Sequence, residues 1–144
     1  MDVDVEVLSE VTDEVVEAFE RLLPQLSTNA KRLDGAALSA IVATAASTVL
    51  VARIDEEIVG TLTLATFAIP TGVRAWIEDV VVDEGSRGKQ VASRLIDEAI
   101  KIARQAGART VDLTSRPTRE SAGRLYERLG FEQRETRFYR YKLG

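Results

Sequence analysis

One segment, residues 80–94, constrains the fold of this chain more than any other. It opens with three consecutive valines, a run typical of a buried strand. A short loop with two glycines follows, and apolar residues then recur at helical spacing up to the stop signal Gly107. The segment therefore predicts a strand that passes through a tight loop directly into a long amphipathic helix over residues 88–106.

The start of this helix is a candidate anion site. The first amides of a helix lack internal acceptors, and the helix dipole favours a negative charge beside them. Arg87, Lys89 and Arg94 add positive charge at the same end. A phosphate cradle and a plain strand-to-helix turn with solvated basic residues both fit these local features, and neither the Walker pattern nor the three-glycine Rossmann fingerprint matches.

Alternation, capping residues and turn residues place the other elements around this unit. A helix capped by Thr12 should stop at Pro24, and a second helix should turn Leu38, Ile41 and Val42 inward. A helix capped by Thr118 should end at Gly130. Strands are predicted at residues 3–7, 48–54, 58–67, 73–82, 110–114 and 135–143, with a hairpin between the second and third. This order indicates an α+β fold.

Composition narrows the chemistry. The 144 residues suit one domain spanning residues 1–144, and they include no cysteine and no histidine. We therefore expect no disulfide, no metal site and no imidazole base, so a general base must be a carboxylate, a tyrosine, a lysine, a chain terminus or a water relay. A net charge of −4 disfavours nucleic acid as a partner, and no apolar run is long enough for a membrane. We expect a cytoplasmic protein.

Two adjacent carboxylates, Glu78 and Asp79, precede the valine run. Neighbouring strand residues face opposite sides, so only one should enter any one cleft unless a bulge intervenes. Glu78 is the first candidate for a general base, acting through water, and Asp79 is the second. The alternative is that both are strand-end charges held by arginines.

The residues Arg87-Gly88-Lys89-Gln90-Val91-Ala92 resemble the coenzyme-A signature of the GNAT superfamily of N-acetyltransferases, Arg/Gln-x-x-Gly-x-Gly/Ala. Gln90 stands where the signature has its middle glycine, which is tolerable if its φ is negative and its side chain turns outward. The resemblance implies that acetyl-CoA is held by the main chain of the valine strand and by the phosphate loop, at Val80, Val81, Val82, Arg87, Gly88, Lys89, Gln90, Val91, Ala92 and Ser93.

A second segment, residues 122–131, is similar to the other GNAT hallmark, Asn-x-x-Ala-x-x-Leu/Phe-Tyr-x-x-x-Gly-Phe. The resemblance assigns Tyr126 as the general acid that protonates the leaving thiolate of coenzyme A. A tyrosine hydroxyl, with an ordinary pKa near 10, is able to donate that proton. The alternative is a packing residue of an amphipathic helix. Arg119 replaces the signature asparagine, and we expect it to meet a phosphate.

The resemblance implies a layered α/β/α fold with a mixed, mostly antiparallel sheet of six or seven strands, splayed in the middle and flanked by about four helices. It also implies direct transfer of an acetyl group from acetyl-CoA to a primary amine of a small molecule or peptide in a ternary complex. A non-catalytic acyl-CoA-binding sensor is the alternative. A homodimer stays open, because aromatic residues such as Trp76 and Phe138 suit either a cleft or a partner subunit.

Overall fold

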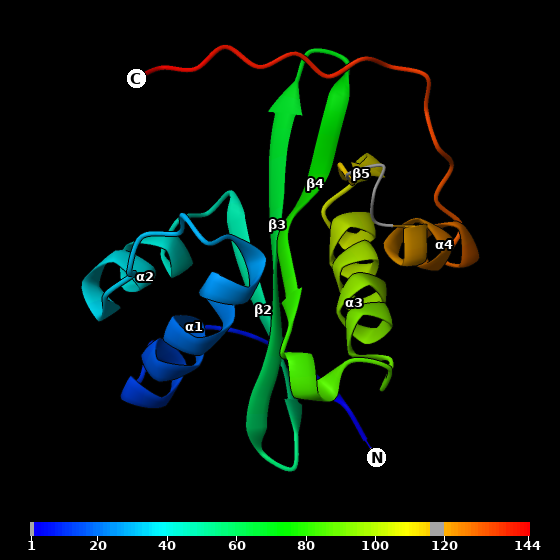
Figure 1. Ribbon diagram of the computed structural model, residues 1–144. Coiled ribbons are helices and arrows are strands. Elements are labelled where there is room, and N and C mark those ends of the chain that lie inside the picture. Colours follow the sequence, from blue (N-terminus) through cyan, green and yellow to red (C-terminus); the bar gives the residue numbers. More distant parts are fainter. Residues whose placement is uncertain (1, 116–119) are drawn as a thin grey trace. The chain divides into compact units, whose positions relative to one another are not determined.

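The computed structural model describes residues 2–115 and 120–144, although not the side chain of Glu120, and it divides the chain into two compact units (Figure 1). The first unit is Met1–Leu113 and the second is Thr114–Gly144. Within the described residues, no helix combines the length and the apolar character needed to cross a bilayer.

The first unit is built on a single sheet. Its strands follow one another in chain order, each antiparallel to the next except the last pair, which is parallel. The mixed, mostly antiparallel sheet is thus confirmed, although it has five strands in the described residues instead of the expected six or seven. The strands are β1 (Asp4–Val7), β2 (Ser47–Ile54), β3 (Glu57–Ile69), β4 (Gly72–Val82) and β5 (Ala108–Asp112).

Helices cover both faces of this sheet, as expected for a layered α/β/α fold (Figure 1). Helices α1 (Asp13–Leu26) and α2 (Gly35–Val42) lie on one face and α3 (Val91–Gln105) lies on the other. Thr12 caps α1 as predicted. The predicted stop at Pro24 is wrong, because the helix continues to Leu26 and its last turn keeps the bond from the Ser27 amide to the Leu23 carbonyl, 3.0 Å.

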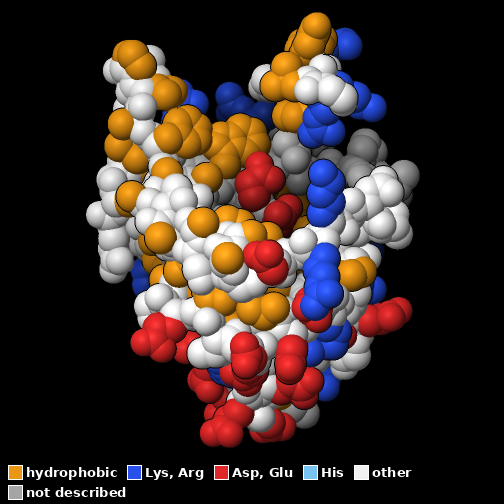
Figure 2. Space-filling view, turned by 90° about the vertical axis from the view of Figure 1, so that its left-hand side faces the viewer, with side chains coloured by type: hydrophobic (Ala, Val, Ile, Leu, Met, Phe, Trp, Pro, Cys, Tyr) orange, Lys and Arg blue, Asp and Glu red, His pale blue; other side chains and the backbone are white. Residues whose placement is uncertain are grey.

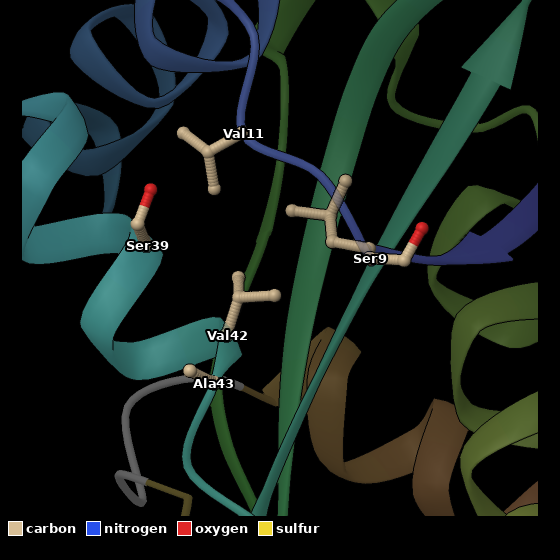
Figure 3. A pocket seen from close by; sticks show the side chains of 6 residues that line it. Ser9, Val11, Ser39, Val42 and Ala43 are labelled. Carbon is tan, nitrogen blue, oxygen red and sulfur yellow. The ribbon is translucent and has the colours of Figure 1, made fainter.

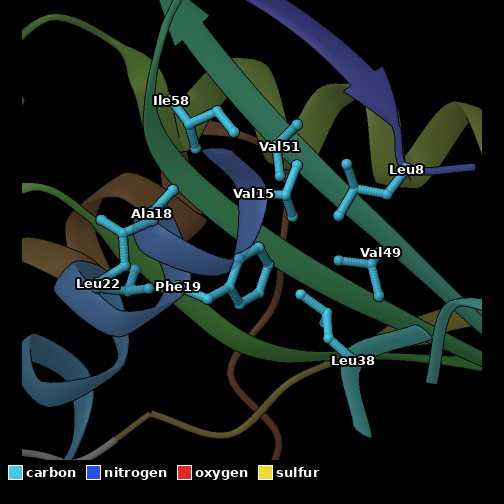
Figure 4. Packing of buried hydrophobic residues seen from close by; sticks show 10 residues of the cluster. Leu8, Val15, Ala18, Phe19, Leu22, Leu38, Val49, Val51 and Ile58 are labelled. Atoms are coloured by element: carbon cyan, nitrogen blue, oxygen red, sulfur yellow. The ribbon is translucent and has the colours of Figure 1, made fainter. Parts of the chain in front are cut away.

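The face under α1 and α2 holds a hydrophobic cluster (Figure 4). Phe19 and Leu22 of α1 and Leu38 of α2 pack there against strand residues. Ile41, which we expected to turn inward, is 37% exposed, since the buried stripe of this short helix follows Leu38 and Val42, one turn apart. The remaining buried members are Leu8, Val15, Ala18, Val49, Val51, Ile58 and Val81.

The opposite face packs against α3 through a narrow approach. Leu95, Ile96, Ala99 and Ala103 of this helix are fully buried. A Cβ atom added at Gly60 of β3 would lie 3.0 Å from Val91 Cγ1, 3.2 Å from the Val81 carbonyl oxygen and 3.3 Å from Leu95 Cδ1. Glycine at this point therefore lets the first turn of α3 lie directly on the sheet.

The predicted hairpin between β2 and β3 is confirmed, and its two turn residues, Asp55 and Glu56, have φ of 49° and 69°. Positive φ at both positions is the geometry of a type I′ turn, whose twist matches that of the strands. Beside the turn, Arg53 donates to Glu6 at 2.7 Å and to Glu14 at 3.1 Å. The hydrogen bond to Glu14, followed by that to Glu6, raises the pKa of Arg53 above its ordinary value.

Acidic side chains gather at the lower end of the face that carries α1 and α2 (Figure 2). The first turn of α1 carries Asp13 and Glu14, where the helix dipole favours negative charge. Arg53 offsets part of this charge, since it joins β2 to both β1 and α1. The ion pairs of Arg53 thus stabilise the attachment of α1 to the sheet.

The second unit contains helix α4 (Glu120–Arg128), and the described residues after it form no strand. The predicted strand over residues 135–143 is therefore wrong, which accounts for part of the difference in strand number. Its large apolar side chains are 64–96% exposed, so the alternating apolar residues bury no surface that would stabilise a strand. Thr118, the predicted cap of α4, lies outside the described residues.

Candidate functional site

The loop between β4 and α3 is more irregular than the sequence predicts. A 3₁₀ turn, Glu84–Ser86, follows the strand, and the helix begins at Val91 instead of Gly88. Gly88 and Gln90 have φ of 82° and 63°, and two left-handed residues so close together cannot continue a right-handed helix. A Cβ atom added at Gly88 would meet nothing within 4 Å, so the loop is open at this point.

The N-terminus of α3 lacks the side-chain cap that both other helices of this unit possess. The side chains of Thr12 and Asp34 accept hydrogen bonds from the first turns of α1 and α2, at 3.3 and 2.8 Å. Gln90 makes no such bond, and the first α3 amide with a helical acceptor is that of Arg94, which donates to the Gln90 carbonyl at 3.1 Å. The amides of residues 91–93 are therefore directed at the loop without a helical acceptor.

Positive charge surrounds these amides. Arg87, Lys89 and Arg94 are exposed, and among the residues that the structure describes none of the three takes part in an ion pair. Asp83, the acid that directly follows β4, is instead paired with Arg21 at 3.3 Å. Open amides, a helix dipole and cations without an ion pair are features that suit a diphosphate, so the role of these residues toward the phosphates of coenzyme A stays a prediction.

The backbone of Gln90 lacks the negative φ that would make a side chain tolerable at this position. Its φ is positive, 63°, with ψ of 22°, so its backbone is in the left-handed region that glycine adopts most readily. The signature has glycine at this position because glycine adopts the left-handed conformation without steric cost. Glutamine holds the same backbone conformation at a cost of about 1 to 2 kcal/mol.

Part of β4 has an open edge beside this loop. The parallel pairing with β5 runs from Val73 to Trp76, and the described residues of β5 reach no further along β4. Val80, Val81 and Val82 lie beyond that point, and only Val81 is fully buried by side-chain packing. The end of β4 thus offers main-chain groups on the side away from β3.

A bulge in β4 sets the directions of the two adjacent carboxylates. Thr63 is paired with Glu78 while Thr61 is paired with Val81, so two residues of β4 lie opposite Leu62. Asp79 is one of them and has a φ of 50°. Because Val81 packs in the cluster under α1, the register places Glu78 on the face that carries α1 and α2.

Glu78 and Asp79 are both exposed, and within the described part of the chain neither forms an ion pair. Strand-end charges held by arginines, the alternative that the sequence left open, are not observed there. The strained backbone of Asp79 costs about 1 to 3 kcal/mol, a feature often found at functional sites. From the sequence, a bulge was named only as the exception that would let both carboxylates enter one cleft. No glycine or other residue type typical of a bulge indicates one at this position.

Tyr126 belongs to the second unit, where its main chain closes α4. The Phe131 amide donates to the Tyr126 carbonyl at 3.0 Å and the Gly130 amide to the Glu127 carbonyl at 3.1 Å, which is a Schellman cap. The rings of Tyr126 and Phe131 meet edge to face at 6.0 Å between centroids. The second signature thus encodes a helix end, and the role of the Tyr126 hydroxyl stays a prediction. Arg119 lies outside the described residues.

Two polar residues of α1 contact the loop, although no sequence pattern singled them out. Arg21 and Gln25 are one helical turn apart and both reach Asp83, which follows β4 directly. Their spacing of four residues was the available signal, since such residues share one helix face. No sequence pattern named the partner 58 residues away.

A separate hollow of about 390 Å³ lies between α2 and the segment that precedes α1 (Figure 3). None of the predicted site residues lines it. Its walls combine apolar side chains with two serine hydroxyls, from Leu8, Ser9, Val11, Ser39, Val42 and Ala43.

Comparisons with known proteins show the family to which the chain belongs. The model of the acetyltransferase (GNAT) family matches residues 9–131. An acetyltransferase of Trypanosoma brucei is 30% identical in its crystal structure, with 99% of this chain and 100% of that one covered and a TM-score of 0.79. A transcriptional regulator of Bacillus halodurans is 26% identical, with coverage of 98% and 100% and a TM-score of 0.81.

Among curated proteins, the aminoalkylphosphonate N-acetyltransferase of Salmonella typhimurium is 39% identical over 62 residues, which are 43% of this chain and 40% of that protein. The matches cover between 27% and 49% of the length of four such relatives. The family model spans well over half of the chain, and it includes the loop, the bulge and Tyr126. The chain therefore belongs to the GNAT family of acetyltransferases.

Proposed function

We propose that the chain is an acetyl-CoA-dependent N-acetyltransferase that moves an acetyl group directly to a primary amine in a ternary complex. The observation that carries this proposal is the uncapped N-terminus of α3, beside cations that form no ion pair with the residues that the structure describes, in a chain of the GNAT family. Membership of the GNAT family supports acetyl-CoA as the coenzyme, and the geometry of the loop suits its phosphates. Because the family model runs from residue 9 to residue 131, we treat residues 1–144 as one domain.

In this proposal the coenzyme binds along the open end of β4 and over the loop. The main chain of Val80, Val81 and Val82 pairs with the pantetheine arm, in the way a further strand would. The amides and cations of residues 87–93 hold the diphosphate, and Arg119 contributes at the same phosphates. Acetyl-CoA supplies a thioester whose carbonyl carbon the amine attacks.

Glu78 acts as the base in the same scheme. The amine arrives as an ammonium ion and must lose a proton before its nitrogen bonds to the acetyl carbon. Glu78 is exposed on the face that carries α1 and α2, with no arginine bound among the described residues, so its carboxylate is available to take that proton through water. Asp79, its neighbour in the bulge, is the second candidate.

The Glu78→Gln variant tests this role. Loss of the base should depress kcat most at low pH, where the smallest fraction of the amine is already neutral. An unchanged pH–rate profile would remove Glu78 from the mechanism. Asp79→Asn separates the two candidates, because it removes only the adjacent charge and keeps the bulge residue close in size; if Asp79 is the base, this variant and not Glu78→Gln should change the pH–rate profile.

Tyr126 acts as the acid. As the C–N bond forms and the C–S bond breaks, the departing thiolate takes the hydroxyl proton of Tyr126. Phenylalanine at this position would keep the ring contact with Phe131 and the cap of α4. Release of free thiol with a panel of amines should therefore fall sharply in Tyr126→Phe while the helix content of the protein stays the same.

A non-catalytic acyl-CoA-binding regulatory module is the second candidate. Two observations favour it: Gln90 carries a side chain where the signature has glycine, and the similar Bacillus halodurans protein is described as a transcriptional regulator. Tight binding of acetyl-CoA without turnover of any amine would support this candidate. Turnover that depends on Tyr126 would support the enzyme.

A further inference from the structure

The end of α1 is attached to the start of the loop by a set of side-chain hydrogen bonds. Gln25 Nε2 donates to Asp83 Oδ1 at 3.3 Å, and Gln25 Oε1 accepts from the Glu84 amide at 2.9 Å. Arg21 Nε donates to the other carboxylate oxygen of Asp83, also at 3.3 Å. Both oxygens of Asp83 and the amide that follows it are thus held from one helix.

The two α1 side chains are themselves fixed in place. Arg21 NH2 donates to the Ile58 carbonyl at 2.6 Å, which anchors the guanidinium to the start of β3. Gln25 Nε2 also donates to the Arg21 carbonyl at 3.1 Å, so its amide group is oriented by its own helix. A side chain anchored at both ends loses little further freedom when it holds a partner.

The position of these contacts matters more than their contribution to stability. Glu84 is exposed and Asp83 is half-buried, so water is available to satisfy both groups if α1 releases them. Asp83 is the residue at which the chain leaves the sheet, since its amide still donates to the Val59 carbonyl at 2.7 Å. Its carbonyl then accepts from the Ser86 amide at 2.8 Å, within the 3₁₀ turn. Its orientation therefore sets the direction in which the loop departs.

We propose that Arg21 and Gln25 are positioning residues for the coenzyme, which hold Asp83 and Glu84 so that the loop presents the open amides of α3 in one fixed direction. This inference rests on the proposed binding of coenzyme A at the start of α3. A preorganised loop loses less conformational entropy on binding, so the contacts raise coenzyme affinity without touching the ligand.

Exchanging the amide and the carboxylate between positions 25 and 83 tests the hydrogen bond between Gln25 and Asp83. Gln25→Glu places a carboxylate against the carboxylate of Asp83, and the repulsion between them should move the side chain away from the Glu84 amide. Asp83→Asn added to this variant restores a donor and an acceptor in reversed order. Glu20→Gln is the control, because it removes the ion pair between α1 and Arg32, 2.9 Å, which is remote in sequence from the loop.

We expect the dissociation constant of acetyl-CoA, measured by calorimetry, to rise about tenfold in Gln25→Glu, as for a lost hydrogen bond to a charged group. The double variant should recover most of this loss. In the unliganded protein, hydrogen exchange at the Glu84 amide should accelerate in Gln25→Glu and slow again in the double variant. Thermal stability should change no more than in Glu20→Gln.

Different results would contradict the positioning role of Arg21 and Gln25 and the proposed binding of coenzyme A. An unchanged dissociation constant in Gln25→Glu, with the wild-type protein binding the coenzyme, would overturn the positioning role and leave the proposed function intact. A loss of affinity that the double variant does not recover would also overturn it. A wild-type protein that does not bind acetyl-CoA at all would overturn both.

Discussion

The substitution Gln90→Gly tests the backbone geometry of the loop. Gln90 has a φ of 63° and a ψ of 22°, and a residue with a Cβ atom pays about 1 to 2 kcal/mol for that conformation. Glycine removes this strain and adds about 0.5 to 1 kcal/mol of unfolded-chain entropy. The net expectation is a gain of up to about 1.5 kcal/mol in the free energy of unfolding.

Thermal unfolding followed by circular dichroism measures this gain. For a chain of this size, each kcal/mol corresponds to about 2 to 4 °C, so Tm should rise by up to about 6 °C. Gln105→Gly is the matched control, because the same substitution at the last residue of α3 meets a helical backbone. Glycine costs up to about 1 kcal/mol there, and Tm should fall.

A fall in Tm for Gln90→Gly would refute the left-handed geometry, because only a residue with negative φ loses stability on that change. Calorimetry with acetyl-CoA adds a second result. Glycine leaves the amides of residues 91–93 unobstructed, so the affinity should rise. No gain in affinity would mean that the Gln90 side chain does not crowd the phosphates.

Three further predictions concern packing, charge and chemistry. Gly60→Ala places a methyl group 3.0 Å from Val91 Cγ1, and denaturant unfolding should show a loss of about 1 to 3 kcal/mol, whereas a stable variant would contradict the close approach of α3. Arg53→Met should cost about 0.5 to 1 kcal/mol at low salt and less at high salt, because its ion pairs are partly exposed; a cost independent of salt would contradict an ionic role. Tyr126→Phe should lower the rate of thiol release without raising the KM of acetyl-CoA, and full activity would exclude the acid role.

The elements of the first unit could be predicted because their signals are local. The valine run, the cap at Thr12 and the stop at Gly107 each depend on residues close in sequence, and the structure confirms all three elements. The tail over residues 135–143 has alternation as well, but a strand also needs a neighbour and a covered face. The alternating pattern by itself predicts neither a neighbouring strand nor a covered face.

At the candidate site, too, features that depend on neighbouring residues could be predicted and those that depend on distant contacts could not. Residue types at the loop were readable from sequence, since basic residues around a helix start suggest an anion. The bulge at Asp79 and the left-handed Gln90 were not, because both conformations result from the pairing of β4 with β3 and the packing of α3. The contacts of Gln25 with the loop join residues 58 and 59 positions apart, a separation at which no local pattern gives the partner.

The central claim is that amides at the start of α3 grip the diphosphate of coenzyme A. Backbone amide shifts recorded by NMR during titration with acetyl-CoA test it most directly. We expect saturable shifts concentrated at residues 87–93, and a loss of affinity when Arg87 and Lys89 are both replaced by glutamine. Saturable binding that leaves those amides unmoved, or no binding at all, would contradict the claim.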